Sequence, residues 1–380
     1  MSARSVLHTI HRWVGISLCV PLVVLGLTGS VLVFEHELGA LFDPSPRASA
    51  PDATPSIDAI VAAARAVAPT DTAPTVLIAP SAPLDPAIVR FAPKRGEPGA
   101  GAVQVFVDPA SLAVLDVRAG DPGLLRWIFR LHANLTTHDR SGRAVVGWLG
   151  AAMTFFGLSG IVLWWPAPGQ WRRAFTVQRG ARGFRLFRQL HGAAGIWGLA
   201  VFLTVSVSGT YLAFPQTLGG AVASILPVRD LRNAPTVARP EGGAQPRGVD
   251  DAVAAARATL PDGALRMIGF PARPDQPLRL SFARPGDVAG QPLVTLFVDP
   301  YRARVIERRD PAAFSAGESV LAWQHALHSG RGAGWLWQSL VFVCGLLPAL
   351  FATSGIAMWL ITRRARRRPA LRTLAAEPAE

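Results

Sequence analysis

The chain has 380 residues, of which 50% are hydrophobic and only 17% are charged. Its mean hydropathy of +0.30 is high for a water-soluble globular protein of this length. The formal net charge is +13 at pH 7, but no basic stretch carries the interleaved aromatic residues of a nucleic-acid-binding segment, so nucleic acid is excluded as a partner. The composition predicts a membrane protein, long enough for two or three domains.

Several common sites are absent from the sequence. Cys19 and Cys344 both lie inside long apolar runs and do not form a disulfide framework. There is no Cys-x-x-Cys-His motif, which excludes a covalently attached c-type haem. Neither glycine-rich phosphate-binding motif occurs, so the chain has no recognisable nucleotide-binding domain of its own.

Four stretches without charged residues are long enough to cross a hydrocarbon core of roughly 30 Å. They run from about Trp13 to Phe34, Ala144 to Trp165, Gly192 to Phe214, and Ala333 to Thr362. The first is too long for the apolar core of a signal peptide, which has about 7–15 residues, so we interpret it as an uncleaved signal-anchor. The chain is therefore expected to be a membrane protein with four transmembrane α-helices.

Arginine predicts the orientation of these spans. The segment between the second and third spans and the tail after the fourth are arginine-rich, whereas the two long loops, 35–143 and 215–332, are nearly charge-balanced. By the positive-inside rule, both termini and the short link face the cytoplasm of a bacterial inner membrane, and both long loops lie outside. The arginines concerned are Arg172, Arg173, Arg179, Arg182, Arg185 and Arg188 in the link, and Arg363, Arg364, Arg366, Arg367, Arg368 and Arg372 in the tail.

The sequence contains an internal duplication. His11-Arg-Trp-Val-Gly15 matches His191-Gly-Ala-Ala-Gly195 at an offset of 180 residues, and five further matches follow in the same order with a slowly drifting offset. We interpret the chain as two parallel repeats, each a helix going out, an external segment and a helix coming back. The further matches are Thr28-Gly29 with Ser208-Gly209, Ala62–Ala66 with Ala254–Ala258, Phe106-Val-Asp-Pro109 with Phe297-Val-Asp-Pro300, Leu131-His132 with Leu327-His328, and Ser159-Gly160-Ile161 with Ser354-Gly355-Ile356.

Each long loop is expected to form a small α+β module, with one helix on a short antiparallel sheet. Helices are predicted at Ser56–Ala68 and Asp250–Leu260, each followed by four strand-like runs. The predicted organisation is a first transmembrane helix (1–40), an external module (41–122), an amphipathic segment and second helix (123–166), an arginine-rich link (167–190), a third helix (191–216), a second module (217–314), an amphipathic segment and fourth helix (315–363), and a cytoplasmic tail (364–380).

The histidines carry the most informative chemistry. A lone histidine near a membrane face is usually an interfacial side chain that reaches water. Duplication, however, places His11 opposite His191 near the inner face, and His132 opposite His328 near the outer face. Two histidines converging from opposite helices are the axial arrangement of a b-type haem, whereas zinc would require four ligands. The glycines beside them favour either room for a flat macrocycle or close helix packing.

The outer pair depends on one structural choice. His132 precedes the second apolar run by 12 residues, so either that helix extends outward or the amphipathic segment Leu124–Leu135 packs down at the membrane surface. His325, His138 or His36 are alternative outer ligands, and His8 is a further histidine at the inner face. Trp127, Arg126 and Arg130 line either an outer haem or its substrate, or only an amphipathic interface.

These motifs resemble those of the PepSY-associated transmembrane proteins, over about residues 5 to 365. The carrying features are the histidine–glycine heads of the spans, the Phe-Val-Asp-Pro strands and Leu327-His-Ser-Gly330. The external segments resemble PepSY domains, and the four-helix form without a fused flavin domain is similar to inner-membrane ferric-siderophore reductases of the FoxB type. The resemblance implies two b-type haems, with His11, His191, His132 and His328 as axial ligands of the haem iron.

The resemblance further implies an enzyme that reduces siderophore-bound Fe(III) in the periplasm and releases Fe(II), with electrons from a cytoplasmic or quinol donor. Hard oxygen donors hold Fe(III) much better than Fe(II), so a one-electron reduction releases the metal. Two rival interpretations stay open. One is a haem-b electron-transfer protein that serves another acceptor or oxidises quinol. The other is a non-enzymatic sensor or scaffold in which the histidines are structural.

Overall fold

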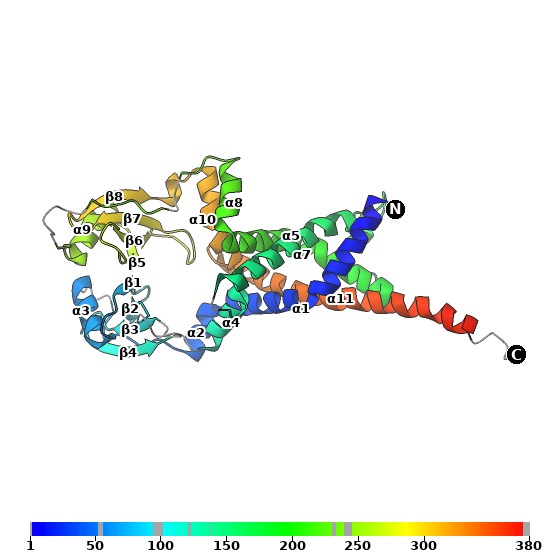
Figure 1. The fold of residues 1–380 in the computed structure, drawn as a ribbon, viewed down its shortest axis with the longest axis horizontal. Coiled ribbons are helices and arrows are strands. Elements are labelled where there is room, and N and C mark those ends of the chain that lie inside the picture. The colour runs from blue at the N-terminus through cyan, green and yellow to red at the C-terminus, as the bar shows by residue number, and fades with distance from the viewer. Residues whose placement is uncertain are drawn as a thin grey trace. The chain divides into compact units, whose positions relative to one another are not determined.

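The computed structural model describes residues 2–51, 56–93, 102–120, 123–137, 139–229, 233–238 and 245–374. The chain forms two compact units. The first, which we call the helical unit, comprises Met1–Glu35, Trp127–Gly220 and Gln324–Glu380. The second, the sheet unit, comprises His36–Arg126 and Ala221–Trp323. Figure 1 shows the four long helices of the first unit and the strands of the second.

The helical unit is built on four long helices that are long and apolar enough to cross a membrane, as the sequence predicted. They are α1 (Ala3–Val33), α5 (Arg140–Trp164), α7 (Gly183–Ala213) and α11 (Gly334–Leu374). Most side chains of their apolar stretches lie at the surface of the unit rather than inside it. An apolar surface of this extent is stable only where lipid covers it.

The four helices pack as two matched pairs. The closest pairs are α1 with α11 and α7 with α5, and α1 with α5 and α7 with α11 complete the arrangement. Glycine permits these approaches: a Cβ atom at Gly26 of α1 would overlap the carbonyl oxygen of Gly345 in α11, and one at Gly157 of α5 would meet Leu203 of α7 at 2.6 Å. Ser30 also donates a hydrogen bond of 2.8 Å to the carbonyl of Phe342. Small residues at helix contacts are typical of membrane bundles.

Short helices flank the long ones. The amphipathic segment before α5 forms a separate helix, α4 (Leu124–Asn134), because Leu135 and Thr136 turn the chain with φ of 52° and 60°. Likewise α10 (Ala316–His328) is separated from α11 by Gly330, Gly332 and Gly334, all with positive φ. The remaining short helices are α2 (Glu35–Phe42), α6 (Trp171–Ala174), α8 (Pro215–Ala223) and the 3₁₀ turn η1 (Pro311–Ala313).

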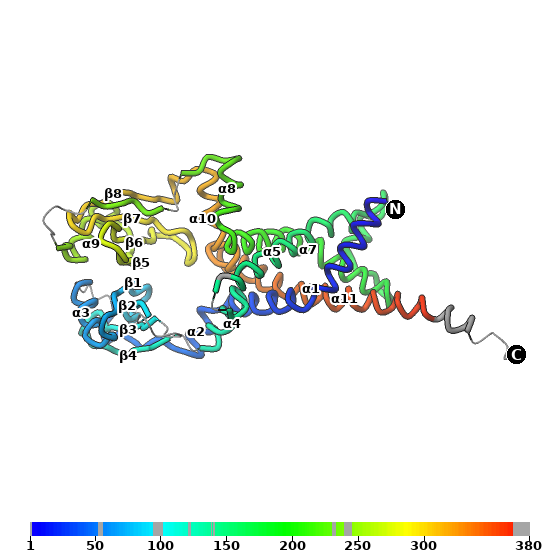
Figure 2. The backbone as a smooth tube through the Cα atoms, viewed as in Figure 1, coloured from blue at the N-terminus to red at the C-terminus, as the bar shows by residue number. Residues whose placement is uncertain are grey.

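The sheet unit contains one eight-stranded antiparallel sheet in the order β4-β3-β2-β1-β5-β6-β7-β8. The sequence predicted a separate short sheet in each long loop; the structure instead joins them through β1 and β5. Figure 2 traces the chain through both sets of strands. The strands are β1 (Pro74–Ile78), β2 (Ala87–Phe91), β3 (Val103–Val107), β4 (Val114–Ala119), β5 (Ala264–Gly269), β6 (Leu278–Ala283), β7 (Val294–Asp299) and β8 (Arg304–Arg309).

The central strand pair, β1 and β5, joins residues at equivalent positions of the two long loops. Leu77 of β1 is directly opposite Ile268 of β5. These residues are 191 positions apart, the offset at which the Phe-Val-Asp-Pro motif recurs. Leu77 and Ile268 are both fully buried and face the same core, because opposite residues of an antiparallel pair point to one face of the sheet. Helices α3 (Ile57–Val67) and α9 (Val249–Thr259) cover that face.

Matched contacts recur in the two halves of the sheet. The guanidinium of Arg118 lies 4.6 Å from the ring centre of Phe106, and that of Arg309 lies 4.5 Å from Phe297, again at an offset of 191. The aspartate of each Phe-Val-Asp-Pro motif is buried and accepts hydrogen bonds from the turn that follows it. For Asp108, a hydrogen bond from Ser49 is the main reason that the pKa of the carboxyl lies well below its usual range.

The two helices that cover the sheet, α3 and α9, cap each other. Asp250 of α9 accepts hydrogen bonds from the Ile57 amide at 2.7 Å and from the Ser56 hydroxyl at 2.5 Å at the start of α3. Asp58 of α3 accepts hydrogen bonds from the Val249 and Asp250 amides at 2.8 and 3.0 Å. Burial opposes ionisation of Asp250, but the hydrogen bonds outweigh it and hold the pKa of this carboxyl below its usual value. Each carboxylate thus satisfies amides of the partner helix that lack intrahelical acceptors.

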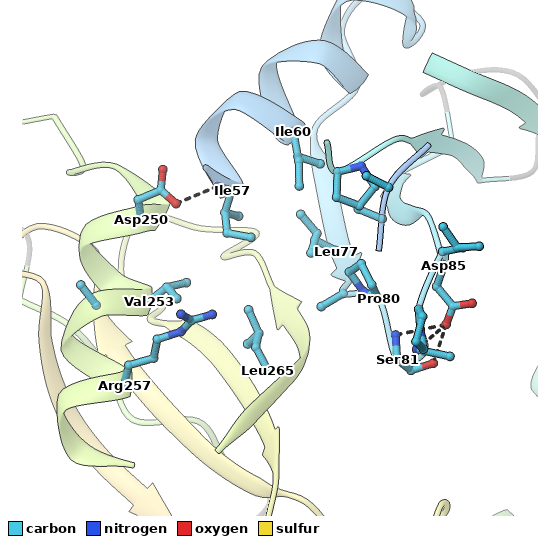
Figure 3. Close-up of a pocket in the computed structure, with 18 residues that line it drawn as sticks. Ile57, Ile60, Leu77, Pro80, Ser81, Asp85, Asp250, Val253, Arg257 and Leu265 are labelled. Atoms are coloured by element: carbon cyan, nitrogen blue, oxygen red, sulfur yellow. Dashed lines mark hydrogen bonds between the residues drawn. The ribbon is translucent and has the colours of Figure 1, made fainter. Parts of the chain in front are cut away.

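A cavity of about 600 Å³ lies beside these caps (Figure 3). Its walls are apolar side chains, including Ile60, Leu77 and Leu265, together with the loop after β1. Asp85 holds that loop by accepting hydrogen bonds from the backbone amide and hydroxyl of Ser81. Arg257 is the basic residue at the wall, contributed by α9.

Removal of either capping carboxylate is expected to loosen the other helix. Asp58→Ala should speed amide hydrogen exchange in the first turn of α9, and Asp250→Ala should do so in the first turn of α3, each at a cost of about 1 kcal/mol in stability. Hydrogen-exchange mass spectrometry on the full chain measures both. Asp262→Ala, an exposed loop carboxylate, is the control and should change stability by less than about 0.5 kcal/mol. Loosening confined to the substituted helix itself would contradict the reciprocal arrangement.

Candidate functional site

The structure brings the four sequence-predicted histidines together as two pairs in the helical unit. His11 of α1 and His191 of α7 form the first pair, with ring centres 6.3 Å apart. His132 of α4 and His328 of α10 form the second pair, with ring centres 6.0 Å apart. The short helices α4 and α10 therefore resolve the choice left open by the sequence, because the outer histidines come from separate helices and not from extended spans.

Each ring of the first pair is fixed by a serine of a neighbouring helix. His11 Nδ1 lies 2.8 Å from the hydroxyl oxygen of Ser159 in α5, and His191 Nδ1 lies 2.9 Å from that of Ser354 in α11. The Ser354 hydroxyl donates its own hydrogen to the carbonyl of Leu350 at 2.6 Å, and that of Ser159 donates to the carbonyl of Phe156 at 3.3 Å. With the serine hydrogens engaged in this way, each serine oxygen accepts from Nδ1–H and Nε2 is the basic nitrogen of the ring.

Phenylalanine rings give the first pair a second constraint. The Phe156 ring packs edge-on against His11 with centres 5.1 Å apart, and Phe351 packs against His191 at 4.9 Å. These phenylalanines are 195 positions apart, the same offset as the two serines. Each imidazole is thus held by one hydrogen bond and one aromatic face, which fixes its orientation before any ligand binds.

The second pair is held by backbone carbonyls. His132 Nδ1 lies 3.1 Å from the carbonyl oxygen of Leu25 in α1, and His328 Nδ1 lies 2.9 Å from that of Val205 in α7. A carbonyl can only accept, so Nδ1 carries the hydrogen in both rings and Nε2 is again the basic nitrogen. Thr28 and Ser208 lie at 3.1 and 3.3 Å from the same Nδ1 atoms.

Glycine makes these two carbonyl oxygens accessible to the histidine rings. In an α-helix the carbonyls of Leu25 and Val205 also accept from the amides four residues on, which belong to Gly29 and Gly209. A Cβ atom at Gly29 would lie 3.0 Å from Cε1 of His132, and one at Gly209 would lie 2.7 Å from Cε1 of His328. A side chain at either position would therefore push the imidazole off its carbonyl. Of the two explanations for these glycines, close packing applies here.

The other four repeat glycines are different. Gly15, Gly160, Gly195 and Gly355 line a cavity of about 1740 Å³ that also contains both rings of the first pair. A Cβ atom at Gly160 or Gly355 would meet no atom within 4 Å and would project into this space. The missing side chains thus leave open room beside His11 and His191.

The residues present fit a b-type haem. A metal ion about 2 Å from each of two Nε2 atoms would hold the ring centres roughly 6 Å apart, as both pairs do. Among the described residues there is no cluster of three or more histidine, cysteine or carboxylate side chains, so a zinc site has no support there. In addition, the buried Nε of Arg12, next to His11, has no hydrogen-bond partner in the described chain, and an anionic group in the cavity would supply one.

The remaining predicted site residues lie elsewhere. His325 and His36 are exposed, and His138 lies outside the described residues. His8 is exposed and lines the cavity of the first pair. Trp127, Arg126 and Arg130 are exposed on α4, whereas His132 of the same helix points at α1.

The fit of His328 against Gly209 can be tested by a single methyl group. Gly209→Ala should lower the thermal stability of the protein by about 1–3 kcal/mol, because the new Cβ overlaps a ring held by hydrogen bonds. Thermal unfolding of the detergent-solubilised chain, followed by tryptophan fluorescence, measures this. In Gly220→Ala of α8 the Cβ meets nothing within 4 Å, so this control should be neutral or stabilising by less than about 1 kcal/mol. Equal losses in both variants would argue against the contact.

Comparison with known proteins agrees with this architecture. The family model for the PepSY-associated TM region matches residues 8–361, which is most of the chain and contains all four histidines of the pairs. No curated protein matches the chain. By the extent of this match, the chain belongs to the PepSY-associated transmembrane family.

Proposed function

We propose that the protein binds two b-type haems, one between His11 and His191 and one between His132 and His328. The carrying observation is that four histidines form two pairs with ring centres 6.3 and 6.0 Å apart, each with Nδ1 already hydrogen-bonded. A b-type haem has no covalent attachment to the protein, and two histidines can supply both axial nitrogens of its iron. Ligand rings whose second nitrogen is held by the protein are typical of metal sites.

We further propose that the halves are parallel repeats related by a twofold axis along the membrane normal, with two PepSY-like modules joined in one sheet. The matched contacts support this arrangement: Ser159 and Ser354, Leu25 and Val205, and the central pair of β1 and β5. Arginine distribution supports cytoplasmic termini and an inner-membrane location, with the first pair near the cytoplasm and the second near the periplasm.

The residues divide the work of such a site. Bound haem would supply one-electron chemistry, and the protein would position it and set its potential. Ser159 and Ser354 keep the Nε2 lone pairs of the first pair free for iron by occupying Nδ1. The carbonyls of Leu25 and Val205 do the same for the second pair. Apolar packing on the rings, such as Phe156 on His11, helps to hold their orientation.

The acceptor that suits this arrangement is a ferric siderophore in the periplasm. Its Fe(III) is bound by hard oxygen donors and takes one electron to give Fe(II), which those donors hold weakly. The electron comes from a cytoplasmic or quinol donor on the other side of the bilayer. The protein is then an oxidoreductase of iron uptake, a ferric-siderophore reductase.

Haem content tests the pairing. Purified wild-type protein should show a Soret band and two haems per chain, and His11→Ala and His328→Ala should each lose one haem and keep the other. His36→Ala, an exposed histidine of the sheet unit, is the control and should keep both. A wild-type protein without a Soret band would contradict the haem proposal and favour a sensor or scaffold role. Loss of both haems in each variant, with normal thermal stability, would contradict the separate pairs.

A ferric siderophore added to the dithionite-reduced protein tests the acceptor. The reduced absorption bands should disappear, with one Fe(II) trapped by ferrozine for each electron consumed. The same siderophore loaded with Ga(III) has the same charge and shape but cannot be reduced, so it should leave the bands unchanged. If the bands persist with the ferric form while a quinone analogue reoxidises the protein, the siderophore assignment fails and a haem-b protein with another acceptor is favoured.

A further inference from the structure

The cavity that contains the first histidine pair is larger than one bound cofactor requires. Its volume is about 1740 Å³, whereas small-molecule sites in proteins usually enclose about 300–1,000 Å³. It reaches from His11 and His191 to the ends of α1, α7 and α11, and to the link between α5 and α7. Room therefore remains beside the histidines for a second molecule.

The cavity wall is strongly basic. Eight arginines from α1, α6, α7 and α11 line it, and none of the described lining residues is an aspartate or glutamate. The two propionates of a haem can engage about two arginines in bidentate pairs. Arg12 is placed for such a role, since it is next to His11 and its buried Nε lacks a partner. The other arginines exceed what one haem can neutralise.

Aromatic side chains are interleaved with these arginines on the wall. Trp13, Trp164, Trp165 and Trp359 all line the cavity. The Arg363 guanidinium lies 5.1 Å from the ring centre of Trp359, and that of Arg12 lies 5.4 Å from Trp13. Guanidinium groups bind phosphate, and indole rings stack on planar ring systems. The combination suits a planar aromatic molecule that carries phosphate.

The link between α5 and α7 is folded to form part of this wall. The Trp164 indole donates to the carbonyl of Ala174 at 3.1 Å, and the Trp197 indole donates to that of Phe175 at 3.0 Å. Arg4 of α1 donates to the carbonyl of Leu163 in the last turn of α5 at 2.9 Å and to that of Trp165, where the link begins, at 3.3 Å. These contacts hold the link in a defined conformation that forms part of the cavity wall. Basic residues that only contact lipid headgroups would not require such an ordered link.

This wall also breaks the match between the two halves. His11 and His191 are matched by the repeat, but Arg12 is replaced by Gly192 at the equivalent position. The first half continues into the folded link, whereas α11 of the second half runs on as one uninterrupted helix to Leu374. The cavity wall is therefore not equivalent in the two halves.

We propose that this cavity binds a phosphate-bearing planar aromatic ligand, the chemical class of flavin and nicotinamide nucleotides. The ligand would lie between the arginines and the four tryptophans that line the cavity. The concave shape fits a small molecule, whereas a docked protein would need a surface of about 800 Å² on this side. Soluble electron donors belong to this class of ligand, so in the proposed function the cavity would bind the cytoplasmic electron donor. The binding site itself rests only on the cavity, its charge and its aromatic wall.

Isothermal titration calorimetry with flavin mononucleotide and with NADPH tests this, on the full chain in phosphatidylcholine nanodiscs at about 0.15 M salt to screen long-range charge. At least one nucleotide should bind at micromolar concentration, and riboflavin, which lacks the phosphate, should bind at least about tenfold more weakly than flavin mononucleotide. Failure of both nucleotides to bind, or binding of riboflavin at micromolar concentration as tight as that of flavin mononucleotide, would overturn the proposal.

A matched pair of double variants distinguishes the cavity from general surface charge. Arg173→Gln with Arg363→Gln removes two lining arginines, and should weaken nucleotide binding by about tenfold or more. Arg172→Gln with Arg364→Gln removes the adjacent exposed arginines, which do not line the cavity, and should leave binding unchanged. Equal weakening in both would assign the effect to net charge and overturn the proposal.

Two further measurements separate the possible outcomes. Nanodiscs containing phosphatidylglycerol should leave nucleotide binding intact; its abolition would mean that lipid phosphate occupies the arginines and would overturn the proposal. The Soret band is recorded on every sample. Nucleotide binding without a Soret band would refute the haem proposal and support the nucleotide site. A Soret band without nucleotide binding would support the haem proposal and refute the nucleotide site.

Discussion

The hydrogen bond at Nδ1 of each paired histidine is the interaction on which the candidate site depends. In all four cases the acceptor belongs to a helix other than the one that carries the histidine. The position of every ring is therefore set by helix packing and not by the rotamer of one side chain alone. A shift of α1 against α5, or of α10 against α7, would move a ring off its acceptor and leave a buried polar group unpaired, which costs about 1–3 kcal/mol.

Helix packing in turn depends on small residues. Gly26 and Gly345 bring α1 and α11 into contact, and Gly157 does so for α5 and α7. At the second pair, glycine has a more specific purpose, because it leaves the carbonyls of Leu25 and Val205 open to a second donor. Beside the first pair, Gly160 and Gly355 border the open cavity, and no side chain occupies the space next to them. Glycine thus has three roles in the helical unit: it allows helices to pack closely, it leaves backbone carbonyls accessible to histidine, and it leaves open space in the cavity.

Much of this was accessible from the sequence, for physical reasons that also set the limit. Apolar runs longer than about 20 residues have few alternatives to spanning helices, and alternating runs placed strands β2 and β3 at their observed bounds. Pairing of His132 with His328 followed from the repeat, and a separate amphipathic segment ending at Leu135 was one of two alternatives. The choice between them stayed open because positive φ at leucine has no sequence signature. The carbonyl acceptors and the β1–β5 joint involve only backbone atoms, which leave no side-chain pattern.

The repeat also shows where the two ends of the helical unit differ. Both pairs of imidazoles are matched in geometry, and their acceptors are matched in type within each pair. Yet the second pair comes from short helices outside the four long ones, whereas the first lies within the long helices beside an open cavity. Arg12 opposite Gly192, and a folded link opposite a straight helix, occur only beside the first pair. Duplication explains what is common to the two sites. The residues that differ between the halves therefore reflect the different surroundings of the two pairs. A basic cavity with aromatic side chains lies beside the first pair, whereas the second pair is carried by the short helices α4 and α10.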